Sequence, residues 1–147
     1  MEETMNTTDA SKRTVILMDA AKNGQITLLR EQLQSAIDAN ARDEYEDTAL
    51  IVAARNGRTV IVKELLQVPG IDVNAKRPHG GKTALIHAAK NGKIGMVKDL
   101  LSMSGIDLDV IDKYGKSALM YAEEESHTEI VNMLQQAIKA HINHPDL

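Results

Sequence analysis

The stretch Leu50-Ile-Val-Ala-Ala-Arg-Asn-Gly57 recurs, with variations, three more times along the chain. Its counterparts align without gaps and are Leu17-Met-Asp-Ala-Ala-Lys-Asn-Gly24, Leu85-Ile-His-Ala-Ala-Lys-Asn-Gly92 and Leu119-Met-Tyr-Ala-Glu-Glu-Glu-Ser126. The final residues of the four copies are 33, 35 and 34 positions apart. A near-constant period of this length indicates a repeat architecture in which each unit stacks on its neighbours.

Each copy continues into a second apolar pattern at helical spacing, as in Ile61, Val62, Leu65 and Leu66. We therefore expect every repeat to be a pair of helices joined by a tight turn. In three copies a glycine ends the first helix, where a positive φ costs glycine nothing. Ser126 takes this place in the fourth copy, so we expect strain or a different turn there.

Polar stretches lead from one helix pair to the next, and we expect them to form hairpin-like loops. Each follows an echo such as Gly70-Ile-Asp-Val-Asn74 and ends in a Thr or Ser directly before an apolar helix. A hydroxyl at this position caps the helix by accepting a free backbone N–H of the first turn. The predicted N-caps are Thr48, Thr83 and Ser117.

Taken in this order, the elements resemble the ankyrin-repeat family over about residues 14–142. The family repeat opens with Thr-Pro-Leu-His, continues through an Ala-Ala pair and a Gly turn, and leaves through Gly-x-Asp-Val-Asn. The chain departs from this pattern at the Pro and His of the opening. The Pro is replaced by Ala49, Ala84 and Ala118, and the His by Ile51, Ile86 and Met120.

The resemblance implies an all-α solenoid of stacked helix-turn-helix units with hairpin-like loops between repeats. We expect four repeats and no more, at about 14–42, 43–76, 77–111 and 112–142. The first and last repeats carry polar residues, Asp19 and Gln135, at positions that the inner repeats use for core packing. Polar residues there suit end repeats, whose outer faces have no neighbouring repeat to cover them. Residues 1–13 are expected to be a mobile segment before the first helix, and 143–147 a fraying tail.

Composition argues against several classes of function. The 147 residues are 43% hydrophobic and 26% charged, which fits one globular domain, and their net charge of −4 gives no basis for a nucleic-acid partner. Without cysteine there is neither a disulfide nor a thiol-based zinc site. The first ten residues have no basic start and no apolar run, so we expect no secretory signal there, and no segment approaches 18 consecutive apolar residues. We expect a cytoplasmic monomer, with specialised export into a host cell left open.

The resemblance further implies a protein-binding module that uses a concave face of loop tips and first helices. We therefore predict an adaptor or inhibitor without catalytic residues, cofactor or metal. The alternatives are an effector acting on a host protein and a structural scaffold that uses the convex face or the ends. The positions predicted to form the binding surface are Glu44, Tyr45, Asp47, Arg55, Asn56, His79, Lys82, Lys90, Asn91, Lys113, Tyr114, Lys116, Glu124 and Glu125.

Charge varies from loop to loop on this surface. Asp43–Asp47 is acidic, Lys76–Lys82 is basic, and Asp112–Lys116 leans basic. Opposite patches close together would set the register of a protein partner, and tyrosines at the tips are typical of binding hot spots. The alternative is structural, because charged loops are often merely solvated. Cations in the last helical turn also stabilise the helix dipole.

Histidine provides little evidence for catalysis or metal binding. His127 resembles the family position that joins neighbouring repeats through hydrogen bonds, and His87 occupies a position that is usually packed. His141, His144 and Asp146 are close enough in sequence to share a metal in principle, but we predict no metal site there. Gly80-Gly81-Lys82 lacks the preceding strand that a phosphate-binding loop needs.

Overall fold

The computed structural model describes residues 7–143, and this part of the chain contains eight α-helices and no strand. The predicted all-α class and the four helix pairs are confirmed. The helices are α1 (Thr7–Asn23), α2 (Ile26–Gln34), α3 (Ala49–Arg55), α4 (Thr59–Leu66), α5 (Ala84–Lys90), α6 (Ile94–Leu101), α7 (Ala118–Glu124) and α8 (Thr128–Asn143).

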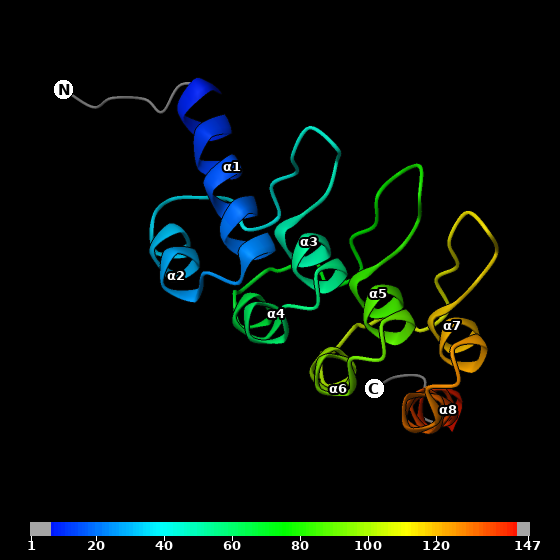
Figure 1. The fold of residues 1–147 in the computed structure, drawn as a ribbon. Helices are drawn as coiled ribbons and strands as arrows, with labels where there is room; N and C mark the ends of the chain where they lie inside the picture. The colour runs from blue at the N-terminus through cyan, green and yellow to red at the C-terminus, as the bar shows by residue number, and fades with distance from the viewer. Residues whose placement is uncertain (1–6, 144–147) are drawn as a thin grey trace.

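The helices form two rows (Figure 1). The first helices of the pairs, α1, α3, α5 and α7, contact one another in sequence, and the second helices, α2, α4, α6 and α8, do the same behind them. Three long loops project from the first row on the same side (Figure 1). The chain is therefore a solenoid whose repeats meet only their neighbours.

Local chemistry starts and stops the helices as the sequence predicts. The hydroxyl oxygens of Thr48, Thr83 and Ser117 accept hydrogen bonds from the backbone N–H groups of Ile51, Ile86 and Met120, with N···O distances of 3.3 Å in each case. The turn glycines have φ values of 70–72°, and Ser126 adopts the same left-handed conformation with φ 58°. The strained alternative predicted for Ser126 is therefore the one observed.

The core consists mainly of small and branched apolar side chains. Ala53, Ala54, Ala88 and Ala89 are fully buried, which allows adjacent first helices to approach closely. Larger side chains such as Leu65 fill the space between the rows, and each such burial stabilises the fold by about 1.5–3 kcal/mol. Close helix packing explains how the chain builds a core without Phe or Trp.

The first helix is longer than predicted. Helix α1 has 17 residues where α3, α5 and α7 have 7, and it extends past the row (Figure 1). The prediction that residues 1–13 precede the first helix is therefore wrong for residues 7–13. This stretch lacks Gly and Pro, and Asp9 in the first turn suits the helix dipole. Asn143, predicted to begin the fraying tail, is instead the last residue of α8. The remaining predicted terminal residues, 1–6 and 144–147, lie outside the described residues.

Candidate functional site

Three loops and the adjoining helix ends make up what we call the hairpin face. It comprises the loops 41–48, 75–83 and 109–117 together with the C-terminal ends of α3, α5 and α7. The loops are not a sheet, since the only bridge in the described residues joins Arg42 to Thr48. Their shape therefore depends largely on side-chain contacts.

The first such contact holds Asp47. Its side chain is fully buried, so its prediction as an exposed contact is wrong. Arg55 Nη1 lies 2.8 Å and Arg77 Nη2 2.5 Å from Asp47 Oδ2. The Asp47 backbone N–H donates to Asp43 Oδ1 at 3.0 Å, which turns the loop end back onto α3. Burial alone would raise the pKa of Asp47, but hydrogen bonds from Arg77 and Arg55 lower it.

A second contact of the same kind holds Asp112, whose side chain is also buried. Lys82 Nζ lies 3.0 Å from its Oδ2, and the Tyr121 hydroxyl donates to the same oxygen. The backbone N–H groups of Tyr114 and Lys116 donate to Oδ1 at 2.9 and 3.1 Å. Burial alone would raise the pKa of Asp112, but these hydrogen bonds outweigh burial and hold it well below its usual range.

The basic loop 75–83 therefore lies between two acidic anchors. Arg77 reaches back to Asp47 and Lys82 reaches forward to Asp112. Lys116 pairs with Glu124 at 2.8 Å, on the surface. Many of the charged side chains in the predicted pattern thus form ion pairs that hold the loops to one another and to the helices.

Thirteen of the fourteen predicted positions remain accessible at least in part. Tyr45 and Tyr114 are 63% and 64% exposed at the loop tips, while Lys82 and Lys116 are half-buried by their ion pairs. Asn56 and Asn91 cap the C-terminal ends of α3 and α5. The other exposed positions are Glu44, Arg55, His79, Lys90, Lys113, Glu124 and Glu125.

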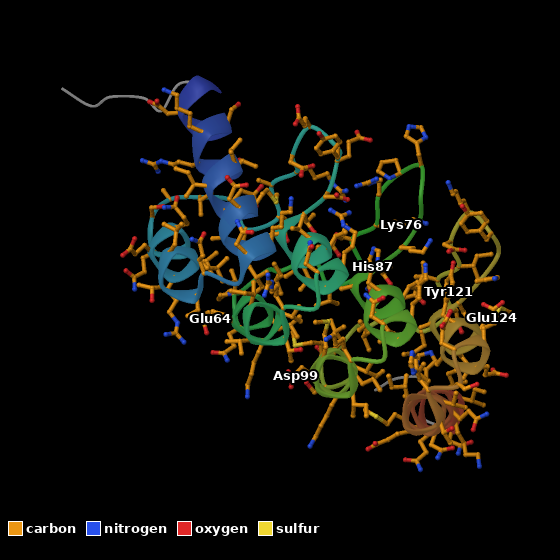
Figure 2. All side chains as sticks on the ribbon, in the orientation of Figure 1. Glu64, Lys76, His87, Asp99, Tyr121 and Glu124 are labelled. Atoms are coloured by element: carbon orange, nitrogen blue, oxygen red, sulfur yellow. The ribbon has the colours of Figure 1, made fainter. Side chains whose placement is uncertain are left out.

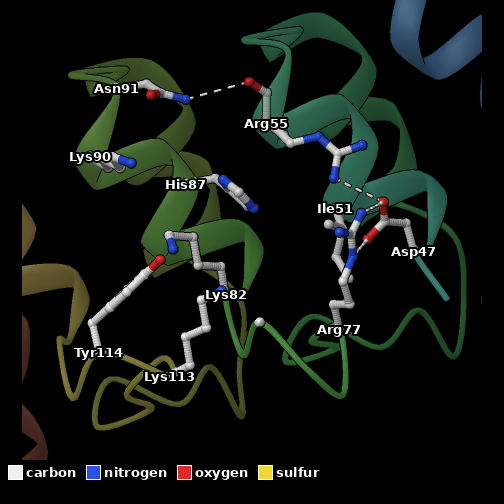
Figure 3. A pocket seen from close by; sticks show the side chains of 11 residues that line it. Asp47, Ile51, Arg55, Arg77, Lys82, His87, Lys90, Asn91, Lys113 and Tyr114 are labelled. Atoms are coloured by element: carbon white, nitrogen blue, oxygen red, sulfur yellow. Dashed lines mark hydrogen bonds and ion pairs between the residues drawn. The ribbon is translucent and has the colours of Figure 1, made fainter. Parts of the chain in front are cut away.

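A pocket of about 400 Å³ opens on this face (Figure 3). Residues from α3, α5 and all three loops converge on it. His87 is half-buried there, and its pKa is lowered to about 4 by burial and then by the positive charges of Arg55 and Lys82. The pocket is lined by Asp47, Ile51, Arg55, Arg77, Gly80, Lys82, His87, Lys90, Asn91, Lys113 and Tyr114.

Other polar residues join successive repeats away from the pocket. His127 Nε2 lies 3.1 Å from the Lys90 carbonyl, which confirms the predicted inter-repeat role of His127. Asn74 donates to the Gly105 carbonyl and accepts from the Asp107 N–H, both at 2.8 Å. This amide link was not predicted, although an Asn recurs at the same place in successive exit motifs, at Asn40 and Asn74.

Within residues 7–143 no three His, Cys, Asp or Glu side chains gather closely enough to hold a metal ion. His144 and Asp146 of the sequence trio lie outside that range, so their arrangement with His141 is not described. None of the helices in the described part of the chain has the length and apolar character needed to cross a membrane.

A sequence profile described as ankyrin repeats (3 copies) matches residues 17–112 and 61–146. The chain belongs to the ankyrin-repeat family. Ankyrin repeats are general protein–protein interaction modules, and the family is typically non-enzymatic. A comparison of the sequence with curated proteins found no significant match.

Proposed function

We propose that the chain is an adaptor or inhibitor that binds one protein partner on its hairpin face. The observation that best supports the proposal is the position of its aromatic side chains. The chain has three Tyr and no Phe or Trp, and Tyr45 and Tyr114 stand exposed at loop tips while Tyr121 is buried. Exposed tyrosines of this kind are enriched at binding hot spots.

The anchored loops also favour binding. Asp47 and Asp112 tie each loop to its neighbour and to a helix before any partner arrives. Ordering flexible loops on binding costs free energy, so binding to loops that are already ordered carries a smaller entropic penalty. The hairpin face therefore offers its tip residues in a fixed arrangement.

Remaining surface charge would orient the partner. Glu44 is exposed on the first loop and Lys113 on the third, so the face presents opposite signs at separated points. Such a pattern selects the register of a partner and speeds association more than it adds affinity. The proposal takes the chain to act as a monomer.

Affinity capture with paired baits tests this proposal. The baits are the wild type, Tyr45→Ala/Tyr114→Ala, and a matched control, Val60→Ala/Ile94→Ala, which removes exposed apolar side chains from α4 and α6. Figure 2 places α4 and α6, with Glu64 and Asp99, away from the loops. Lysates come from the source organism and from any host, and captured proteins are quantified by mass spectrometry.

We expect to find a protein that the wild type and the control capture and the tyrosine variant does not. Its origin in a host lysate would favour the effector alternative. Loss with the control alone would contradict the proposal and favour a scaffold that uses the other side of the stack.

A further inference from the structure

The pocket on the hairpin face carries an excess of positive charge, although the whole chain has a net charge of −4. Five basic side chains line it, and the carboxylates paired with them are those of Asp47 and Asp112. Five cations and two carboxylates leave an excess of three positive charges. The basic residues are Arg55, Arg77, Lys82, Lys90 and Lys113.

Two of these cations have no acidic partner. No carboxylate among the described side chains lies within 4.0 Å of the ammonium groups of Lys90 or Lys113. Lys90 Nζ is 5.5 Å from the ring centre of Tyr121, and Lys113 Nζ is 5.1 Å from that of Tyr114. A ring face attracts a cation without neutralising it. Both ammonium groups therefore remain available to an anion.

Fixed groups surround the two free lysines. Asp47 holds the guanidinium groups of Arg55 and Arg77 at one side of the pocket, and Lys82 lies at the other side (Figure 3). Lys82 is held there by its ion pair with Asp112. Charges held in place before binding attract an anion without the cost of ordering them. His87 lies between them and is neutral at physiological pH, so it can hydrogen-bond to an anion.

We propose that this pocket binds an acidic side chain of the protein partner, through a carboxylate or phosphate group. The inference rests on the proposed function, because it assigns chemistry to one part of the same face. A volume of about 400 Å³ is large enough to admit an acidic side chain of a partner. The ligand pairs with Lys90 and Lys113 while the two internal carboxylate anchors stay intact.

Charge around the pocket favours a local anionic group over a nucleic acid. Glu44 on one flanking loop is exposed and acidic, as are Glu124, the last residue of α7, and Glu125, which follows it. A continuous phosphodiester backbone crossing this face would meet these carboxylates. A single acidic side chain entering the pocket would not.

Binding measurements on three proteins test the proposal. They are the wild type, Lys90→Ala/Lys113→Ala, and the control Lys63→Ala/Lys98→Ala, which removes the same charge from exposed positions on α4 and α6. The probes are inorganic phosphate, a glutamate-rich peptide, a Gly-Ser peptide with one phosphoserine, its unphosphorylated form, and a short single-stranded DNA. Affinity is measured by calorimetry at low salt, and the His87 ring is followed by NMR.

At least one of the two anionic peptides is expected to bind the wild type and the control equally. Lys90→Ala/Lys113→Ala should weaken that binding by about tenfold or more, and the anionic peptide should shift the His87 ring signals. Preference between the two peptides distinguishes a phosphate from a carboxylate. Added salt should weaken both, because charges at the surface are screened.

Equal binding by the two lysine variants would overturn the proposal, as would failure of both anionic peptides to bind. Phosphate that binds alone would indicate a free-anion site, and tighter binding of DNA would indicate a nucleic-acid surface; either result overturns it. None of these results affects the tyrosine-dependent capture, so the proposed function stands or fails separately.

Discussion

Arg77 Nη2 lies 2.5 Å from Asp47 Oδ2, and Arg77 Nε lies 3.0 Å from Asp47 Oδ1. The guanidinium of one loop thus holds the buried carboxylate of the preceding loop in two-point contact. Lys82 directly precedes the helix cap Thr83, just as Asp47 directly precedes the helix cap Thr48, but Lys82 has the opposite charge. This inversion lets the middle loop attract both neighbours, because Lys82 in turn pairs with Asp112.

Replacing the buried carboxylate tests this anchor. Asp47→Asn should lower the free energy of unfolding by about 1–3 kcal/mol, because the amide has no charge and offers Arg55 and Arg77 one acceptor oxygen instead of two. Urea unfolding followed by circular dichroism measures the change. The matched control Glu44→Gln, at an exposed position of the same loop, should change stability by less than about 0.5 kcal/mol. Equal losses in the two variants would mean that Asp47 has no anchoring role.

The second anchor depends on one phenol group. Tyr121→Phe removes the hydroxyl that donates to Asp112 and leaves the buried ring in place, so a loss of about 0.5–2 kcal/mol is expected. Tyr114→Phe makes the same chemical change on an exposed ring and should leave the melting temperature unchanged. If both variants melt like the wild type, the hydroxyl contributes nothing to stability.

Stability should fall in mild acid because of His87. Its pKa is about 4 in the folded chain, against about 6.5 for an unperturbed histidine. Between these values the unfolded chain binds more protons, so the free energy of unfolding rises with pH and is lost as pH falls from about 6.5 toward 4. Arg55, Lys82 and Lys90 oppose protonation, while Asp47 favours it.

Urea unfolding near pH 7 and near pH 4.5 measures this term. The wild type should lose about 2 kcal/mol more than His87→Gln over that interval. Asp47 has a lowered pKa and should stay ionised there, so both proteins keep its anchor. Parallel losses in the two proteins would show that His87 is not the group responsible.

The turn glycine of the third pair is constrained twice. Gly92 has φ 70°, and a Cβ on it would lie 2.7 Å from the His127 ring. Gly92→Ala should therefore cost about 1–3 kcal/mol. Gly95, inside α6, has no positive φ, and a Cβ on it would lie 3.8 Å from the Thr59 side chain, so Gly95→Ala should stabilise the chain by up to about 1 kcal/mol. Thermal unfolding compares the two, and equal signs would contradict the assigned turn geometry.

Sequence periodicity predicts the helix pairs, the caps and the turns because each depends on a few adjacent residues. The hydroxyl of Thr48 caps α3, and Ser126 accepts the left-handed conformation that its place in the repeat demands. The extension of α1 escaped prediction because the repeat pattern begins only near Leu17. The residues before it form a helix without belonging to that pattern.

The candidate surface was harder to predict for a different reason. In the sequence, Asp47 belongs to an acidic loop whose charges are expected to face solvent. Its burial depends on contact with Arg77, which lies 30 residues later in the chain. Which lysines keep a free charge also depends on such contacts between loops. Lys82 pairs with Asp112 while Lys113, on the same loop as Asp112, faces Tyr114.

Hydrogen–deuterium exchange of the chain, alone and with its captured partner, tests most directly whether the hairpin face is the binding surface. Protection by the partner is expected in loops 41–48, 75–83 and 109–117 and at the end of α5, with exchange in the exposed parts of α4 and α6 unchanged. Protection confined to α4 and α6, with the loops exchanging as in the free chain, would contradict it.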